Sequence, residues 1–84
     1  MKKVIIYTAD YCPFCTKAKR LFDIKKISYK EIDVTENKSL REEMEEKSGG
    51  KRTVPQIFID GKSIGGCDDL YALHETEELD ALLK

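Results

Sequence analysis

The hydrophobic residues of the chain follow two spacings, one typical of strands and one typical of helices. Residues 3–7 (KVIIY) include a short apolar run, which predicts a buried strand. Apolar side chains then recur at intervals of three and four, which predicts a helix over residues 13–23 or 13–25. In residues 27–34 apolar and polar positions alternate, which predicts a second strand. A helix between two strands predicts a βαβ unit with parallel strands.

A charged helix and a hairpin are expected next. Residues 39–46 or 39–47 are mostly charged and have two apolar residues one turn apart, which predicts a helix on the surface. These two residues are Leu40 and Met44. Residues 56–59 and 62–64 are expected to pair as antiparallel strands, because the Asp60-Gly61 pair between them readily adopts the positive φ angles of a type I′ turn.

The end of the chain completes the predicted fold. From Asp68 onward we expect one or two short helices with leucines turned inward. The inward residues are Leu70, Leu73, Leu79, Leu82 and Leu83. The order β-α-β-α-β-β-α predicts an α/β fold with a four-stranded mixed sheet and helices on both faces, a thioredoxin-like arrangement. With 84 residues, we expect a single domain over residues 1–84.

Composition and charge exclude some classes of partner. The formal net charge is −1, which gives no reason to expect nucleic acid. The longest apolar run, residues 4–7, is far too short to span a membrane or to form the core of a signal peptide. We therefore expect a cytoplasmic protein that binds neither nucleic acid nor membrane. We also expect it to be a monomer.

The cysteines are the candidates for chemistry. Three cysteines in a reducing compartment do not predict a framework of stabilising disulfides. Cys12 and Cys15 lie directly before the first helix, with Pro13 between them. If Cys12 is the N-cap, the N–H groups of Phe14 and Cys15 can point at its sulfur and stabilise the reactive thiolate. Proline suits the first helical position, because its missing N–H has no partner there.

The two cysteines are expected to have different roles. Cys15 lies one turn into the helix, so it should be more buried and should resolve a disulfide that Cys12 forms by attack. The alternative is a zinc site made of Cys12, Cys15, Cys67 and His74. The spacing from Cys67 to His74 is wrong for such a site, and Pro13 stiffens the first pair, so we prefer the redox interpretation and expect no metal ligands.

Two further stretches can be read in two ways. Val54-Pro55 is at least the start of a buried strand, and base rates predict a trans bond. With a cis bond, Val54 would present its N–H and C=O to an extended peptide. Residues 65–70 (GGCDDL) are at least a turn from a strand into a helix. They can also form a site for a zwitterion, in which N–H groups receive an α-carboxylate and Asp68 pairs with the adjacent ammonium.

Three segments together are typical of one family. They are CPFC at residues 12–15, TVPQIFI at 53–59 and GGCDDL at 65–70. With these segments and REEM at 41–44, the chain resembles a glutaredoxin of the small dithiol class, in the thioredoxin superfamily, over essentially its whole length. The resemblance implies a glutathione-dependent disulfide oxidoreductase that reduces glutathione mixed disulfides and protein disulfides. It implies glutathione as the reductant, no permanently bound cofactor, and glutathionylated proteins and disulfides as partners.

The resemblance also implies roles for individual residues. Cys12 would be the nucleophile and Cys15 the resolving thiol, and the bond before Pro55 would be cis. The implied glutathione-binding residues are Thr53, Val54, Pro55, Gly66, Cys67, Asp68 and Asp69. The glycine carboxylate of glutathione would need a basic group, for which Arg41, Lys51 and Arg52 are the candidates.

Two positions depart from the family pattern. Glutaredoxins often carry a lysine where this chain has Ala9 and a tyrosine where it has Phe14. Without that lysine we expect modest activation of Cys12, unless Lys17 or Arg52 substitutes for it.

Cys67 is either an inert small side chain, which we prefer, or a regulatory thiol. The alternative functions are a thioredoxin-like electron donor recharged by a flavoprotein reductase, and a metal or iron–sulfur carrier.

Overall fold

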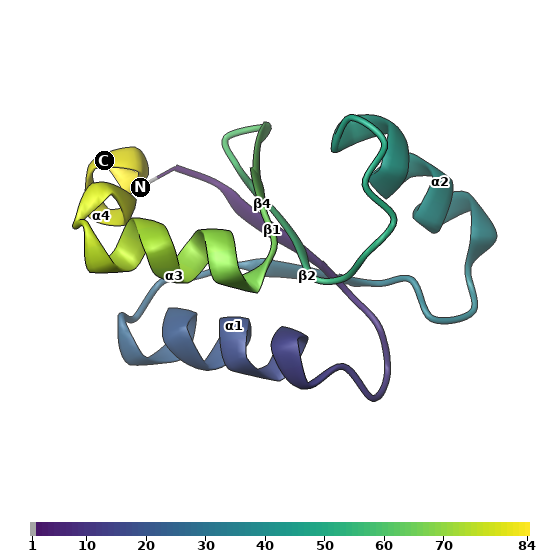
Figure 1. Ribbon diagram of the computed structural model, residues 1–84, viewed down its shortest axis with the longest axis horizontal. Coiled ribbons are helices and arrows are strands. Elements are labelled where there is room, and N and C mark those ends of the chain that lie inside the picture. Colours follow the sequence, from purple (N-terminus) through teal and green to yellow (C-terminus); the bar gives the residue numbers. More distant parts are fainter. Residues whose placement is uncertain (1) are drawn as a thin grey trace.

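The computed structural model describes residues 2–84, in which four strands and four helices follow one another (Figure 1). In chain order they are β1 (Val4–Thr8), α1 (Pro13–Ile24), β2 (Lys30–Asp33), α2 (Lys38–Lys47), β3 (Gln56–Ile59), β4 (Lys62–Gly65), α3 (Cys67–Glu75) and α4 (Glu78–Leu83). The predicted element order is confirmed, and the helical end of the chain divides into two. None of the helices in residues 2–84 is long and apolar enough to cross a membrane.

The sheet has the strand order β2-β1-β3-β4 and is mixed, as the sequence predicts. β1 pairs with β2 in parallel and with β3 in the antiparallel direction. Tyr7 of β1 lies opposite Gln56 of β3, so the C-terminal end of β1 and the N-terminal end of β3 lie side by side. The chain leaves β1 toward α1 and enters β3 at this same end of the sheet.

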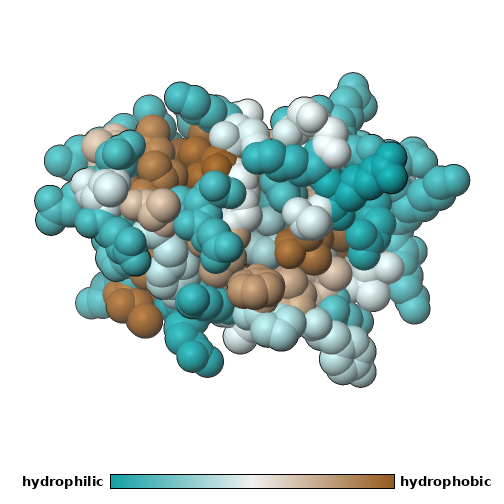
Figure 2. Space-filling model, viewed as in Figure 1, coloured by the Kyte–Doolittle hydropathy of each residue, from teal (hydrophilic) through white to brown (hydrophobic). Residues whose placement is uncertain are grey.

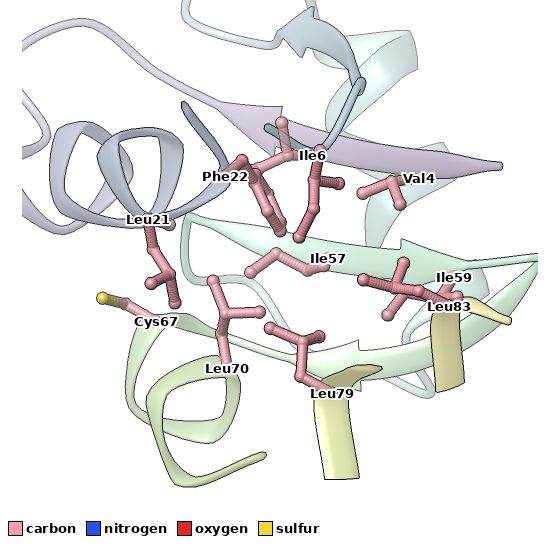
Figure 3. Close-up of a cluster of buried hydrophobic side chains, with 12 residues drawn as sticks. Val4, Ile6, Leu21, Phe22, Ile57, Ile59, Cys67, Leu70, Leu79 and Leu83 are labelled. Carbon is pink, nitrogen blue, oxygen red and sulfur yellow. The ribbon is translucent and has the colours of Figure 1, made fainter. Parts of the chain in front are cut away.

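Two hydrophobic clusters hold helices on opposite faces of the sheet. On one face, α1, α3 and α4 pack against the sheet through the buried side chains of Phe22, Leu70 and Leu79 (Figure 3). On the other face, Met44 of α2 packs with Tyr7 and Phe58. Burying one such side chain contributes about 1.5–3 kcal/mol. Helices on both faces of the sheet are therefore confirmed.

α2 is the charged surface helix that the sequence predicts. It is capped by Asn37, whose side chain accepts the Leu40 N–H at 3.0 Å. Met44 is its one buried residue. The surface over this helix is mostly hydrophilic in Figure 2.

The second strand is shorter than predicted. The alternation in residues 27–34 is correct, since Ile27 packs in the cluster with α1 and Val34 in the cluster with α2. However, β1 offers pairing positions only to Lys30–Asp33. The Ile27 N–H instead donates to the Phe22 carbonyl at 2.8 Å, so this segment completes the end of α1.

The predicted hairpin turn is confirmed. Asp60 and Gly61 have φ angles of 53° and 82°, as a type I′ turn requires. This turn joins β3 to β4, and β4 leads directly into α3.

Candidate active site

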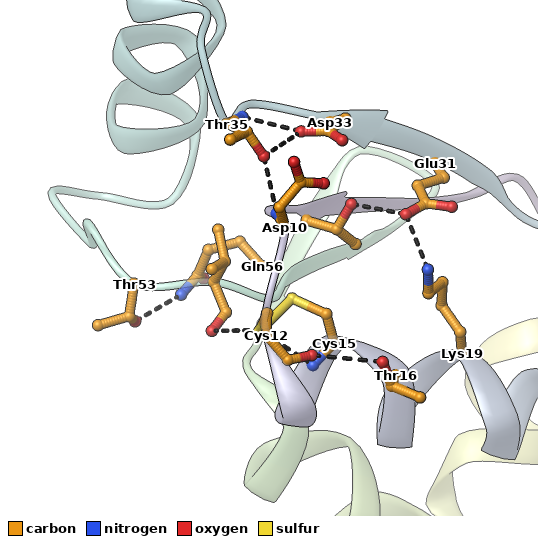
Figure 4. The surroundings of a disulfide bond; sticks show 12 residues. Asp10, Cys12, Cys15, Thr16, Lys19, Glu31, Asp33, Thr35, Thr53 and Gln56 are labelled. Atoms are coloured by element: carbon orange, nitrogen blue, oxygen red, sulfur yellow. Dashed lines mark hydrogen bonds and ion pairs between the residues drawn. A yellow bond between two sulfur atoms is a disulfide. The ribbon is translucent and has the colours of Figure 1, made fainter.

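Cys12 and Cys15 lie at the start of α1 and are joined by a disulfide, with their Cα atoms 5.2 Å apart (Figure 4). Cys12 is the N-cap in extended conformation, and Pro13 occupies the first turn of the helix. The Cys15 N–H donates to Cys12 Sγ at 3.1 Å. The predicted contact between the sulfur and the helix start is therefore confirmed for Cys15. Within residues 2–84 no such bond joins Phe14 to the sulfur.

The two sulfurs differ in exposure. Cys15 is 2% exposed, whereas Cys12 is partly exposed at the surface. A reagent from solution therefore reaches Cys12 more easily. This difference agrees with the predicted order of attack by Cys12 and resolution by Cys15.

The segment before β3 lies beside Cys12. The Val54–Pro55 bond is cis, so the base-rate expectation of a trans bond is wrong and the isomer implied by the family resemblance is present. A base rate over all such bonds contains no information on the tertiary contacts that select the isomer in an ordered segment. Cys12 Sγ lies 3.7 Å from the Val54 carbonyl oxygen.

A cavity of about 440 Å³ opens next to this segment. Its lining residues are Phe14, Lys51, Thr53, Val54, Pro55, Gln56, Gly66, Cys67, Asp68 and Asp69. It therefore brings together eight of the ten residues predicted to bind glutathione, counting the three candidates for its glycine carboxylate. Arg41 and Arg52 are not among its lining residues, and the Arg52 Nε instead pairs with Glu45 Oε1 at 3.1 Å. Of the basic candidates, Lys51 is the one at the cavity.

The start of α3 forms one wall of this cavity. The Asp69 carboxylate accepts the Gly66 N–H at 2.9 Å, so Asp69 caps the helix. The Asp68 side chain is exposed at the cavity. Helix-start N–H groups and a free carboxylate thus occur side by side, as the zwitterion interpretation requires.

Cys67 is the free cysteine of the described chain and is 4% exposed. Burial raises the pKa of its thiol, the nearby Asp68 raises it further, and Lys17 partly opposes both effects. A raised pKa makes the thiolate scarcer, which is typical of an inert side chain.

Within residues 2–84 no group of three His, Cys, Asp or Glu side chains is arranged to hold a metal ion, so the four residues of the zinc alternative do not form a site there.

A second hollow, of about 490 Å³, lies beside the disulfide and was missed by sequence reasoning. It is lined by both Cys12 and Cys15 and by three carboxylates. These are Asp10, Glu31 and Asp33. Hydrogen bonds from Thr8 at 2.7 Å and then from Lys19 at 2.9 Å lower the pKa of Glu31. Strand spacing alone gives no signal that these side chains meet.

Neither proposed substitute for the missing lysine lies free beside Cys12. The Lys17 ammonium lies 4.7 Å from the centre of the Tyr71 ring, and Arg52 is paired with Glu45. Ala9 lines the second hollow. Of the groups expected to stabilise the Cys12 thiolate, the start of α1 is the one in hydrogen-bond contact with the sulfur, through the Cys15 N–H.

A family model described as Glutaredoxin matches residues 4–64. The chain belongs to the glutaredoxin family. It is 52% identical to Glutaredoxin 3 of Escherichia coli over the full length of both chains. The solution structure of a glutaredoxin from Brucella melitensis superposes with a TM-score of 0.87 at 51% identity, covering 100% of this chain and 90% of that one. A crystal structure of a buckwheat glutaredoxin–glutathione complex gives a TM-score of 0.87 at 30% identity, covering 98% and 76%.

Membership of this family makes the protein a thiol–disulfide oxidoreductase with a thioredoxin-like fold. The alternatives, an electron donor recharged by a flavoprotein reductase and a metal or iron–sulfur carrier, are not favoured. The Cys12–Cys15 disulfide is the oxidised form of the redox pair.

Proposed function

We propose that this glutaredoxin reduces glutathione mixed disulfides and protein disulfides through Cys12, with glutathione as the reductant. The observation that carries the proposal is the position of Cys12 Sγ. The sulfur accepts the Cys15 N–H at the start of α1 and lies 3.7 Å from the carbonyl oxygen of Val54, a residue that lines a cavity suited to an amino-acid-like ligand. The donor N–H and the dipole of the helix favour the thiolate by about 0.3–2 kcal/mol.

In the first step the Cys12 thiolate attacks the glutathione sulfur of a mixed disulfide. A Cys12–glutathione disulfide forms, and the substrate thiol leaves as a thiolate that takes a proton from solvent. A second glutathione then attacks the glutathione sulfur of this intermediate. Oxidised glutathione leaves, and the Cys12 thiolate is restored. Each exchange breaks one S–S bond and forms another, so the electrons balance.

With a protein disulfide as substrate, Cys12 first forms a mixed disulfide with the substrate and releases its other cysteine. Cys15 then gives up its proton and attacks Cys12, which releases the second substrate thiol and produces the Cys12–Cys15 disulfide. Two glutathione molecules reduce this disulfide again in two further exchanges. The burial of Cys15 and its helical contact with Cys12 suit an intramolecular attack.

For glutathione itself, we assign the cavity between the segment 53–55 and the start of α3. The backbone of Val54 and Pro55 faces the tripeptide, and Asp68 pairs with the γ-glutamyl ammonium near the amide groups of α3. Lys51 is the group that we assign to the glycine carboxylate, because it lines the cavity whereas Arg52 is paired with Glu45. A buckwheat glutaredoxin has been solved in complex with glutathione, which supports glutathione as the ligand.

The test compares two serine variants in turnover with glutathione and glutathione reductase. Cys12→Ser should abolish reduction of all substrates. Cys15→Ser should keep reduction of a glutathionylated peptide, because one thiol suffices there, and should lose reduction of a protein disulfide. Equal losses in both variants would contradict these roles. Turnover only with thioredoxin reductase would refute the use of glutathione.

Three further expectations belong to this proposal. We propose that residues 1–84 act as one domain, that the protein is a monomer, and that it works in the cytoplasm. The odd number of cysteines and the partly exposed Cys12 of the redox pair agree with a reducing compartment.

A further inference from the structure

The segment that leads to the nucleophile has little packing of its own. Residues 9–11 connect β1 to the N-cap of α1. Asp10 is exposed, and Tyr11 is fully exposed with a φ of 56°, in the left-handed region. Side chains of this segment therefore contribute little to its position, which has to be set by hydrogen bonds.

A threonine beyond the end of β2 supplies such a bond. The Asp10 N–H donates to Thr35 Oγ1 at 2.7 Å, and the Thr35 hydroxyl donates to Asp33 Oδ1 at 2.6 Å. The Thr35 N–H donates to the same carboxylate oxygen at 2.8 Å. Because the hydroxyl hydrogen is directed at Asp33, an oxygen lone pair is left for the Asp10 N–H. Figure 4 shows this relay beside the disulfide.

The relay holds the chain at Asp10, two residues before Cys12. A backbone bond from the Val34 N–H to the Thr8 carbonyl, 2.8 Å long, fixes the residue before the segment. The bond from the Asp10 N–H to Thr35 fixes the middle of residues 9–11. The Cys12 sulfur that follows is stabilised only while it stays within hydrogen-bond distance of the Cys15 nitrogen, 3.1 Å away. Displacements well below 1 Å weaken contacts of this kind, so an anchor at Asp10 bears directly on the thiolate.

We propose that Thr35 is a positioning residue for the redox chemistry, and that its hydroxyl, oriented by Asp33, holds the segment before Cys12 so that the sulfur stays against the start of α1. The inference rests on the nucleophilic role proposed for Cys12. The hydroxyl of Thr35, and then its N–H, lower the pKa of Asp33. The carboxylate is therefore ionised at neutral pH and accepts both bonds.

The test uses three variants of the full chain. Thr35→Val removes the hydroxyl at nearly constant shape, and Thr35→Ser keeps it. The matched control is Thr76→Val, since the Thr76 hydroxyl also makes local bonds, to the Ala72 carbonyl at 3.2 Å at the end of α3. Each reduced protein is alkylated with iodoacetamide across a range of pH, and mass spectrometry locates the modified sulfur. Thermal unfolding is recorded alongside.

Thr35→Val should move the midpoint of Cys12 alkylation upward by roughly 0.4 to 1 pH unit, the equivalent of one hydrogen bond. Thr35→Ser should match the parent. Thr76→Val should lower the unfolding temperature and leave the midpoint in place. A merely structural role of Thr35 would lower the unfolding temperature in the same way without moving the midpoint.

A double variant tests the relay itself. Asp33→Ala also removes a negative charge from the hollow that Cys12 lines, which by itself lowers the midpoint. The two variants break the same chain of bonds, so the upward shift caused by Thr35→Val should be smaller in the Asp33→Ala background than in the parent. Additive shifts would overturn the inference. So would an unchanged midpoint in Thr35→Val, an equal shift in Thr76→Val, or a Thr35→Ser protein that behaves like Thr35→Val. Alkylation of Cys15 in place of Cys12 in the parent would instead overturn the proposed function, and this inference with it.

Discussion

Replacing Gly65 with alanine should reduce the stability of the fold and disturb the cavity that we assign to glutathione. Gly65 ends β4 with a φ of 112°, a conformation that L-residues rarely adopt. A Cβ at this position would also collide with the carboxylate of Asp69. That carboxylate caps α3 by accepting the Gly66 N–H at 2.9 Å, so the collision removes the cap.

The expected loss is the sum of two effects. Backbone strain at positive φ costs about 1–2 kcal/mol, and the lost cap costs about 1 kcal/mol. The total of about 2–3 kcal/mol is a large share of the roughly 4–13 kcal/mol expected for a chain of this length. In a domain of this size it should lower Tm by roughly 10–20 °C.

Gly61→Ala is the matched control. Gly61 has a φ of 82°, and a Cβ there meets nothing within 4 Å, so alanine at this turn carries the strain without the collision. Thermal unfolding should therefore show a loss about 1 kcal/mol smaller than that of Gly65→Ala. Only Gly65→Ala should raise the KM for glutathione, since only it disturbs the start of α3. Equal Tm losses in the two variants, or an unchanged KM in Gly65→Ala, would refute the reasoning.

Three further outcomes are expected. Asp68→Asn should raise the KM for glutathione several-fold with little change in Tm, while Glu75→Gln at the other end of α3 leaves it unchanged. Cys67→Ala should keep the parent's turnover, and alkylation mapped by mass spectrometry at neutral pH should be slow at Cys67, because burial raises its pKa. Because the pKa of Glu31 is lowered in the folded protein, its ionised carboxylate stabilises the fold at pH values above its ordinary pKa of 4.5. This contribution is lost as the pH falls through the lower pKa that Glu31 has in the folded state. Urea unfolding should therefore show Glu31→Gln to be less stable than the parent at pH 7, with the difference disappearing in strong acid.

Elements defined by local signals could be predicted from the sequence. The helix after Cys12 begins at Pro13 as expected, because N-cap chemistry, proline and helical spacing all act within one turn. The hairpin was predictable because Asp60-Gly61 specifies its own turn. The length of β2 was not, because it depends on how much of β1 remains to be paired, and the sequence of residues 27–34 does not contain that information.

The same distinction applies to the site. The motifs at Cys12 and at Gly66–Asp69 were predictable because each carries its chemistry within a few residues. That Lys51 lines the cavity and Arg52 does not was unpredictable, because Arg52 pairs with Glu45, a residue of α2. Thr35 gave no signal at all, since its partner Asp10 lies 25 residues away in the sequence.

The reactive geometry depends on the register of the hydrophobic core. Opposite pairs on β1 and β3 share a cluster: Ile6 and Ile57 pack toward α1, whereas Ile5 and Phe58 pack toward α2. A slip of one residue would turn each of these side chains to the wrong face, so both clusters together specify one register. The same register places Val54 two residues before the partner of Tyr7, and hence its carbonyl oxygen beside Cys12. Core substitutions that loosen this pairing should therefore reduce the reactivity of Cys12 even though none of them touches the sulfur.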